Sequence, residues 1–388
     1  MQRTVVIALL FALAWLPLGC PVEAQEFEEI TAESEAALDL GLAWLAKNQG
    51  PKGNWESNDL GLVSMGALAF MAAGNAPNRG KYGKEVAKAL EFVVENAKPS
   101  GLLNISDAQR DMYNHGLATF VLGQAQGMIS GNDRRLNRAL DQAMKLIAFT
   151  QCEDGGWDYR AHRGPLGHDL SLVVMQAKAL RSAVDSGLEV PPEVIDMAIK
   201  SVREHYSPQG DRNAPESELQ KMPGQFSYGK GGGGGTTAMA AAGVVCLQEF
   251  GQYDDWRIVK NMDVIAETIK KLPEPKDVKV RNGVMPFDGY TLYYVGQALY
   301  QVNGSYWRES YPKLRDSLAR SQMRDDKKPE LHGCWVDQGA KGGGHVPAKP
   351  GQLYGTSVAC FILAIPNRYL PILQEGKIES LKRSFTGK

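Results

Sequence analysis

The sequence has almost no net charge and contains no dense basic cluster. Its 388 residues include 43 lysines and arginines against 44 aspartates and glutamates. A nucleic-acid-binding surface needs a concentrated excess of positive charge. The charge balance therefore argues against nucleic acid, and we expect a small-molecule ligand instead.

Cysteine is also scarce, and no Cys-x-x-Cys pair is present to suggest zinc. Cys246 and Cys360 lie inside apolar helical runs, while Cys152 and Cys334 lie far apart in the predicted order of helices. We expect these four cysteines to be free and buried.

Long apolar runs are absent after the first twenty residues. The only run, Val5 to Leu18, follows Arg3 and precedes the small-x-small sequence Val22-Glu23-Ala24. This is the pattern of a secretory signal peptide over residues 1–24. The run is short for a membrane-spanning helix. We therefore expect an exported protein, periplasmic or secreted, with no membrane span.

A rival interpretation reads Leu18-Gly19-Cys20 as a lipoprotein box with a lipid anchor at Cys20. Pro17 stands where such boxes prefer Leu, which favours the cleaved signal.

Segments that alternate apolar and polar residues are almost absent, so strands are not expected. Apolar residues instead recur at helical spacing, and the chain from 25 to 388 divides into six helix pairs in one domain. The expected outer and inner helices are 34–49 with 59–73, 83–97 with 111–128, 134–151 with 169–186, 192–205 with 236–250, 256–272 with 288–302, and 307–322 with 354–373. The fold class is all-α, and we expect a monomer.

A motif of Gln, Gly and Trp recurs at the end of two outer helices, which indicates a repeat architecture. Its residues are Gln49, Gly53 and Trp55, then Gln151, Gly155 and Trp157. A Gln at a helix C-terminus can bind backbone groups left free there, and the Trp ring can lie across the neighbouring unit. The motif is expected to join adjacent helix pairs.

The repeated Gln-x-x-x-Gly-x-Trp motif, with six helix pairs and inner helices rich in small residues, resembles the terpenoid cyclase and protein prenyltransferase superfamily. The resemblance to these prenyltransferase and squalene oxidase repeat proteins covers nearly all of the chain after residue 24. It implies an α/α toroid, six helix pairs in a double ring around a central cavity. The same toroid supports several chemistries, so the likeness implies fold more than reaction.

The superfamily's reactive groups are largely missing. Its protein prenyltransferases bind zinc through an Asp-x-Cys pair and a His, and the matching positions here are Asp288, Tyr290 and Gly355. One ligand of three cannot hold a catalytic zinc. The Asp-x-Asp-Asp motif of squalene-type cyclases and the thioester motif of complement-type toroids are absent too. We therefore expect neither a metal nor a cofactor.

The starts of the inner helices should meet at one mouth of the ring and supply the working site. The candidate catalytic residues are Asp288, Asp169 and His115, and the candidate ligand-binding residues are Tyr290, Tyr294, Gln297, Tyr113 and Tyr354. Tyr290, Tyr294 and Gln297 share one face of the helix expected over 288–302, and this face is expected to form part of the cavity wall. Helix capping is a competing explanation for Asp169 and Asp288, and a structural hydrogen bond is one for His115.

The leading functional hypothesis is an exported toroid that binds a small or isoprenoid-like ligand in its cavity, as a diverged enzyme or a receptor. A glycan-active lyase or hydrolase and a non-catalytic scaffold are the alternatives, so enzymatic activity stays open. Separately, the run Gly231 to Gly235 after Lys230 could expose a helix N-terminus to an anion.

Overall fold

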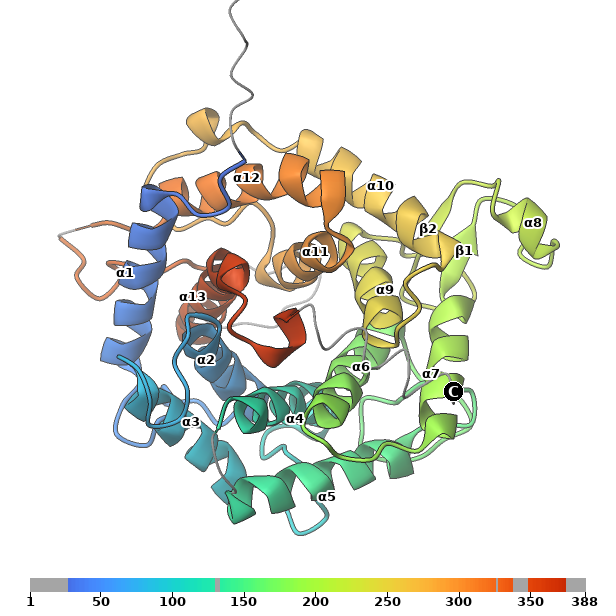
Figure 1. The fold of residues 1–388 in the computed structure, drawn as a ribbon, viewed down its shortest axis with the longest axis horizontal. Coiled ribbons are helices and arrows are strands. Elements are labelled where there is room, and N and C mark those ends of the chain that lie inside the picture. The colour runs from blue at the N-terminus through green and yellow to red at the C-terminus, as the bar shows by residue number, and fades with distance from the viewer. Residues whose placement is uncertain (1–26, 130–132, 326, 338–347, 375–388) are drawn as a thin grey trace, which may run out of the picture.

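The computed structural model describes residues 27–129, 133–325, 327–337 and 348–374. The expected signal peptide and Cys20 lie outside these residues. Within them, two concentric rings of helices surround a common centre (Figure 1). The prediction of an all-α protein is confirmed.

Six helices form the inner ring. Each contacts the next, and the last contacts the first, so the circle of contacts is closed. They are α2 (Leu60–Ala72), α4 (Asp111–Met128), α6 (Leu170–Asp185), α9 (Thr237–Glu249), α11 (Gly289–Val302) and α13 (Ala348–Ala364). Alanine and glycine are frequent along them, and this allows close packing on both neighbours.

The outer ring has one apolar face per helix, which packs on the inner ring. Its members are α1 (Ala32–Asn48), α3 (Gly83–Glu95), α5 (Arg134–Thr150), α7 (Pro192–Glu204), α10 (Trp256–Lys270) and α12 (Gly304–Ser321). Short 3-10 turns lie between or after the helices: η1 (Ala108–Arg110), η2 (Pro275–Asp277), η3 (Ile365–Asn367) and η4 (Pro371–Leu373).

The expected helix boundaries hold to within about three residues except in the sixth unit. There the expected inner helix over 354–373 begins earlier, at Ala348, and ends at Ala364. Pro366 supplies no backbone N–H, and Arg368 has a left-handed φ of 54°. The chain therefore turns away at η3 instead of continuing the helix.

The Gln of the repeated motif joins neighbouring outer helices. Gln49 Nε2 donates to the carbonyls of Gly53 (3.3 Å), in its own turn, and Glu85 (2.7 Å), at the start of α3. Gln151 Nε2 donates in the same way to Gly155 (3.1 Å) and to Val194 (2.9 Å) in α7. The side chain thus bridges the end of one helix to the start of the next outer helix.

The Trp of the motif instead bonds its own outer helix. Trp55 Nε1 donates to the Leu45 carbonyl (2.8 Å), and Trp157 Nε1 donates to the Ile147 carbonyl (2.9 Å). The Trp157 ring is fully buried. Trp holds the glycine turn against the helix before it, and the link between helix pairs is made by Gln.

One mouth of the ring is covered by the chain after α13. The η4 turn crosses the centre in Figure 1 and contacts α4 and α6. Its Ile372 N–H donates to Gln124 Oε1 (3.0 Å), and Tyr300 donates its hydroxyl to the Leu373 carbonyl (2.7 Å). Gln124 and Tyr300 lie near the C-terminal ends of α4 and α11. This segment therefore covers the mouth at the C-terminal ends of the inner helices.

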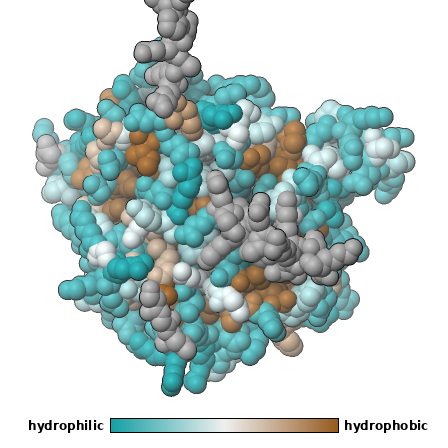
Figure 2. Space-filling model, viewed as in Figure 1, coloured by the Kyte–Doolittle hydropathy of each residue, from teal (hydrophilic) through white to brown (hydrophobic). Residues whose placement is uncertain are grey.

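A small extension projects from the rim beside α7 and α10 (Figure 1). It contains the antiparallel strands β1 (Tyr206–Pro208) and β2 (Gly224–Phe226), with the short helix α8 (Glu216–Leu219) between them. Its outer surface is mostly hydrophilic, and apolar residues on the visible face of the molecule form separate small groups (Figure 2). No helix in the described part of the chain is long and apolar enough to cross a membrane.

Candidate functional site

The N-terminal ends of the inner helices bring polar residues together at the mouth opposite η4. Helix caps place several of them: the Asp169 carboxylate accepts from the Ser171 N–H (2.9 Å), and the Asp288 carboxylate accepts from the Thr291 N–H (3.0 Å). A cap at the first turn satisfies N–H groups that the helix leaves free. The same caps fix the two carboxylates at one opening.

Asp169 is the centre of a hydrogen-bonded chain. Its Oδ2 accepts from the Tyr159 hydroxyl (2.6 Å), and its Oδ1 accepts from the Ser171 hydroxyl. Since the single Ser171 proton is used there, the hydroxyl of Tyr113 donates to Ser171 in turn. His168 Nδ1 lies 3.2 Å from the same carboxylate. Four side chains from three segments are therefore oriented by one aspartate.

Tyr290 and Tyr354 extend this cluster toward the starts of α11 and α13. The Tyr290 hydroxyl is buried close to Tyr113 and has no hydrogen bond of ordinary geometry to the described residues. Tyr354 packs against Gly289, where a Cβ would lie 2.7 Å from its ring. Asp337 accepts from the Gly289 N–H (3.0 Å), so the third carboxylate is held at the same place. Glycine is required at position 289 because any side chain would displace Tyr354.

We call these residues the mouth cluster. It comprises five tyrosines and three aspartates: Tyr113, Tyr159, Tyr228, Tyr290, Tyr354, Asp169, Asp288 and Asp337. The Tyr113 and Tyr159 rings lie 5.7 Å apart, and Tyr228 is close enough to Asp169 and Asp288 for both charges to act on it. Of the candidate site residues, the structure brings together Asp169, Tyr113, Asp288, Tyr290 and Tyr354.

The phenols of the mouth cluster are neutral hydrogen-bond donors. Burial, and after it the neighbouring carboxylates, raises the pKa of Tyr113, Tyr159 and Tyr354 above the usual value for tyrosine. Burial and then Asp169 do the same for Tyr228. A tyrosine with a raised pKa is a poor base at neutral pH. The cluster is suited to donating hydrogen bonds and to presenting aromatic faces beside fixed carboxylates.

His115 is placed away from this cluster, and its two ring nitrogens are both occupied. Nδ1 accepts from the Leu103 N–H (3.1 Å), and Nε2 lies 3.0 Å from the Ala143 carbonyl. The ring is fully buried, and burial lowers its pKa to about 4. Neither nitrogen can reach a ligand, so we remove His115 from the candidate catalytic residues and assign it a structural role.

Tyr294 and Gln297 lie deeper, where protein side chains fill the centre of the ring. Tyr294 is fully buried with its hydroxyl 3.4 Å from the sulfur of Met175, and Gln297 Oε1 accepts from Lys178. These contacts join α11 to α6 across the intervening α9. The expected cavity wall is thus a packed layer at this level, and the two side chains can contact a ligand only if this layer opens.

Lys178 forms a buried ion pair in that layer. Its Nζ lies 3.4 Å from Glu249 Oε1 and 4.3 Å from the centre of the Phe120 ring. Burial lowers the pKa of Lys178, while the charge of Glu249 opposes that shift. Gln301 donates to the same Glu249 oxygen (2.9 Å). The interior at this level therefore contains a buried ion pair with a hydrogen bond from a neighbouring amide.

Sequence reasoning missed Tyr159, Tyr228, Asp337 and the pair Lys178 and Glu249. The first three lie in connections, where no helical spacing marks a face. A signal for Lys178 was present, because it is a charged residue in the middle of a mostly apolar inner helix.

The described residues contain no group of three His, Cys, Asp or Glu side chains arranged to hold a metal. The four cysteines there are free and buried, as expected. In comparisons with known proteins, no protein-family model matches this chain, and no curated protein matches it. The evidence for function is therefore the ring of helices and its mouth cluster.

Proposed function

We propose that the protein is an exported ring of helices that binds a small, hydroxyl-rich ligand of the sugar class at the mouth cluster. One observation carries this proposal: five tyrosines and three aspartates from separate segments lie together at the N-terminal ends of the inner helices. Aromatic faces and fixed polar groups are the usual means of holding and orienting such a ligand. This is the glycan-directed alternative, moved from the central cavity to the mouth.

The charge at the mouth selects among sugars. Asp169 and Asp288 place two carboxylates there, and the nearby Arg110 is itself paired with Asp59 (3.1 Å). Uronic acids would be repelled by this excess of carboxylates, whereas neutral or amino sugars would not. We expect chito-oligosaccharides and cello-oligosaccharides to bind more tightly than oligogalacturonates.

The superfamily resemblance implies an isoprenoid-like ligand, which would have to bind in the centre of the ring. Tyr294 and Gln297 would then have to separate from Met175 and Lys178 to make room. Stabilisation by polyprenyl lipids but by no oligosaccharide would support that function and refute the sugar-class proposal.

The test is a thermal-shift and calorimetric screen of these ligand classes on the purified protein. Tyr290→Phe and Asp169→Asn should weaken binding of the active oligosaccharide. Tyr306→Phe is the matched control, since that hydroxyl bonds Asp263 (2.6 Å) on the outside of the ring. Equal affinities in all three variants would contradict the proposed location.

Asp288 is tested by a separate variant because both of its carboxylate oxygens accept hydrogen bonds from the first turn of its own helix. Oδ1 accepts from the Thr291 N–H and Oδ2 from the Thr291 hydroxyl (2.7 Å). Asp288→Asn keeps most capping ability, so we expect unchanged melting and weaker binding. Lower melting with intact binding would make Asp288 a helix cap only. Assays for new reducing ends and for unsaturated products would show whether the bound sugar is cleaved by hydrolysis or elimination.

A further inference from the structure

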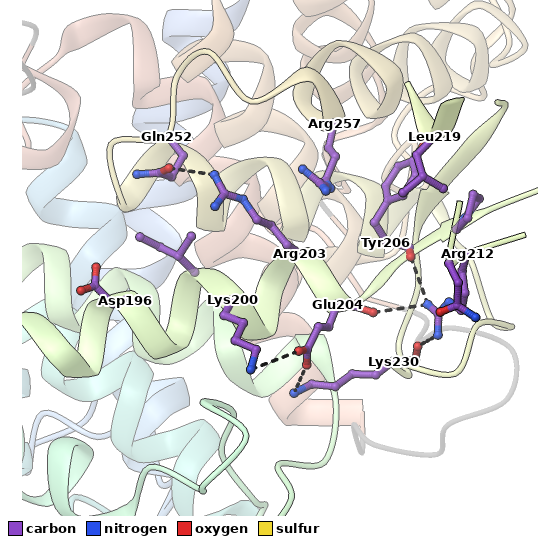
Figure 3. Close-up of a pocket in the computed structure, with 13 residues that line it drawn as sticks. Asp196, Lys200, Arg203, Glu204, Tyr206, Arg212, Leu219, Lys230, Gln252 and Arg257 are labelled. Carbon is purple, nitrogen blue, oxygen red and sulfur yellow. Dashed lines mark hydrogen bonds and ion pairs between the residues drawn. The ribbon is translucent and has the colours of Figure 1, made fainter. Parts of the chain in front are cut away.

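A pocket of about 740 Å³ lies outside the ring, between α7 and the extension that carries α8 (Figure 3). We call it the outer pocket. Its wall contains Ile199, Tyr206 and Leu219, and five basic side chains enter it from α7, the extension, the following loop and α10: Lys200, Arg203, Arg212, Lys230 and Arg257. Two acidic residues line it, Asp196 and Glu204. The lining is therefore rich in positive charge.

Two carboxylates are each shared by two of these cations. Glu204 lies 4.0 Å from Lys200 and 3.1 Å from Lys230. Asp255 lies 2.9 Å from Arg203 and 3.0 Å from Arg257. A shared carboxylate leaves part of the charge of a cation uncompensated when that cation has no second partner, as for Lys200.

Two further carboxylates approach from outside the lining. Asp154 pairs with Lys230 (2.7 Å), and the exposed Glu216 lies 3.8 Å from Arg257. Lys200 has no contact to either, and its side chain is 77% exposed. Lys200 is thus the cation on α7 with the weakest existing partner.

Arg212 is held in place without a carboxylate. Its guanidinium donates to the carbonyls of Tyr206 (3.1 Å), Glu204 (3.3 Å) and Lys230. Among the described residues it forms no ion pair. Backbone carbonyls orient the planar group but do not neutralise its full charge. Asp196 lies at the opposite end of the pocket from Arg212 (Figure 3).

The sequence leaves open an anion site at the helix N-terminus behind the glycine run that follows Lys230. The structure directs its Nζ to Asp154 and Glu204 instead, and Thr236 caps α9 by accepting from the Met239 N–H (3.2 Å). The anion-binding feature of this region is therefore the group of side chains around Arg212.

We propose that the outer pocket binds a small ligand through its carboxylate or phosphate group, with Arg212 and Lys200 as the anion-binding residues. An oriented guanidinium without a carboxylate partner matches such a group, and the exposed Lys200 adds charge. The apolar wall formed by Ile199 and Leu219 accommodates the uncharged part of the ligand. This site is separate from the mouth cluster and does not depend on its function.

The test uses isothermal titration calorimetry with inorganic phosphate and with citrate at constant ionic strength, and with glucose as the neutral probe. We expect one or both anions, but not glucose, to bind the full chain. Phosphate alone would identify a phosphate site, and citrate alone a carboxylate site. Absence of binding by both anions would overturn the proposal.

Three variants decide whether the binding occurs at the outer pocket. Lys200→Gln should weaken binding about tenfold, since one ionic contact is lost. Glu204→Gln should strengthen it, because this change removes a competing carboxylate and releases Lys200 and Lys230. Arg135→Gln on α5, an exposed arginine paired with Glu91, is the control and should have no effect. Any other result from Lys200→Gln or Glu204→Gln refutes this location.

Discussion

Gln322 donates its side-chain N–H to the carbonyl of Ala37 at 2.7 Å, across 285 positions of sequence. It also donates to Gly333 (3.0 Å), as Gln49 and Gln151 do in their own turns. Trp335 completes the pattern by donating to the Leu318 carbonyl (3.0 Å). The last outer helix, α12, is therefore joined to the first, α1, by the same side-chain bridge that joins successive outer helices elsewhere.

Removing this bridge should destabilise the contact between α12 and α1, where the ring closes. Gln322→Ala leaves two buried carbonyls without their donor, which should cost about 1–3 kcal/mol of unfolding free energy. We expect amide exchange to accelerate first in α1 and α12. The control is Gln49→Ala, which removes the same bonds within the chain and should accelerate exchange in α1 and α3. Identical exchange patterns in both variants would contradict the closing role of Gln322.

Trp157 should contribute mainly through burial. Trp157→Ala removes a fully buried ring and should lower the unfolding free energy by about 3–5 kcal/mol. Trp157→Phe keeps an aromatic ring and loses part of the indole together with the hydrogen bond to Ile147, so its cost should be smaller than that of the alanine variant. Chemical denaturation of the two variants measures both values. An unchanged midpoint for Trp157→Ala would show that the turn is not held by this side chain.

His115 should make the fold less stable in mild acid. Its pKa of about 4 lies below the unfolded value of 6.5, so between these values the unfolded chain binds the extra proton. Stability therefore falls as pH decreases through 6.5 and continues to fall until about 4. Between pH 7 and pH 5 the loss from His115 should be about 2 kcal/mol. His115→Gln should be less stable at pH 7 but should show a correspondingly smaller decrease at pH 5.

Removing one partner of the buried Lys178–Glu249 pair should lower the unfolding free energy strongly, whereas replacing both partners should lower it less. Lys178→Met leaves the Glu249 carboxylate without its cation and should cost about 3–5 kcal/mol. The double variant Lys178→Met with Glu249→Gln removes both charges and should recover much of that loss. Unfolding measurements on the two proteins give the comparison. A double variant that is no more stable than the single one would contradict this expectation, because removing the uncompensated Glu249 charge would then have recovered nothing.

The helices and their order could be predicted from sequence because their signals are local. Apolar spacing and caps such as Asp169 and Thr236 mark most helix boundaries, and the spacing of Gln151 and Trp157 indicates the joint between helices. The end of the sixth inner helix was misplaced because Leu370 and Leu373 continue its apolar pattern. They are buried in η4 against the inner ring, so the same residue types serve a different backbone conformation.

The candidate site was predictable only where it coincides with helix starts. Asp169 and Asp288 can be recognised in the sequence as N-caps of inner helices. A closed circle of such helices places their N-caps at the same end of the ring. Tyr159 and Tyr228 lie in connections whose path depends on tertiary contacts, such as the Leu170 N–H that donates to the Tyr228 carbonyl (3.1 Å). The depth of burial could not be predicted from the sequence either, which is why His115 was expected at the mouth of the ring and Tyr294 on the wall of the cavity.

Because α13 contacts both α1 and α2, the ring of helices can close only after α13 has been synthesised. These helices are separated by most of the chain, and such long-range contacts form slowly because a large loop must close first. A growing chain that has emerged only through α11 leaves the apolar side of α2 without its final neighbour. We expect such truncated chains to bind chaperones or aggregate, and full protection of α2 to appear only after α13 has been made.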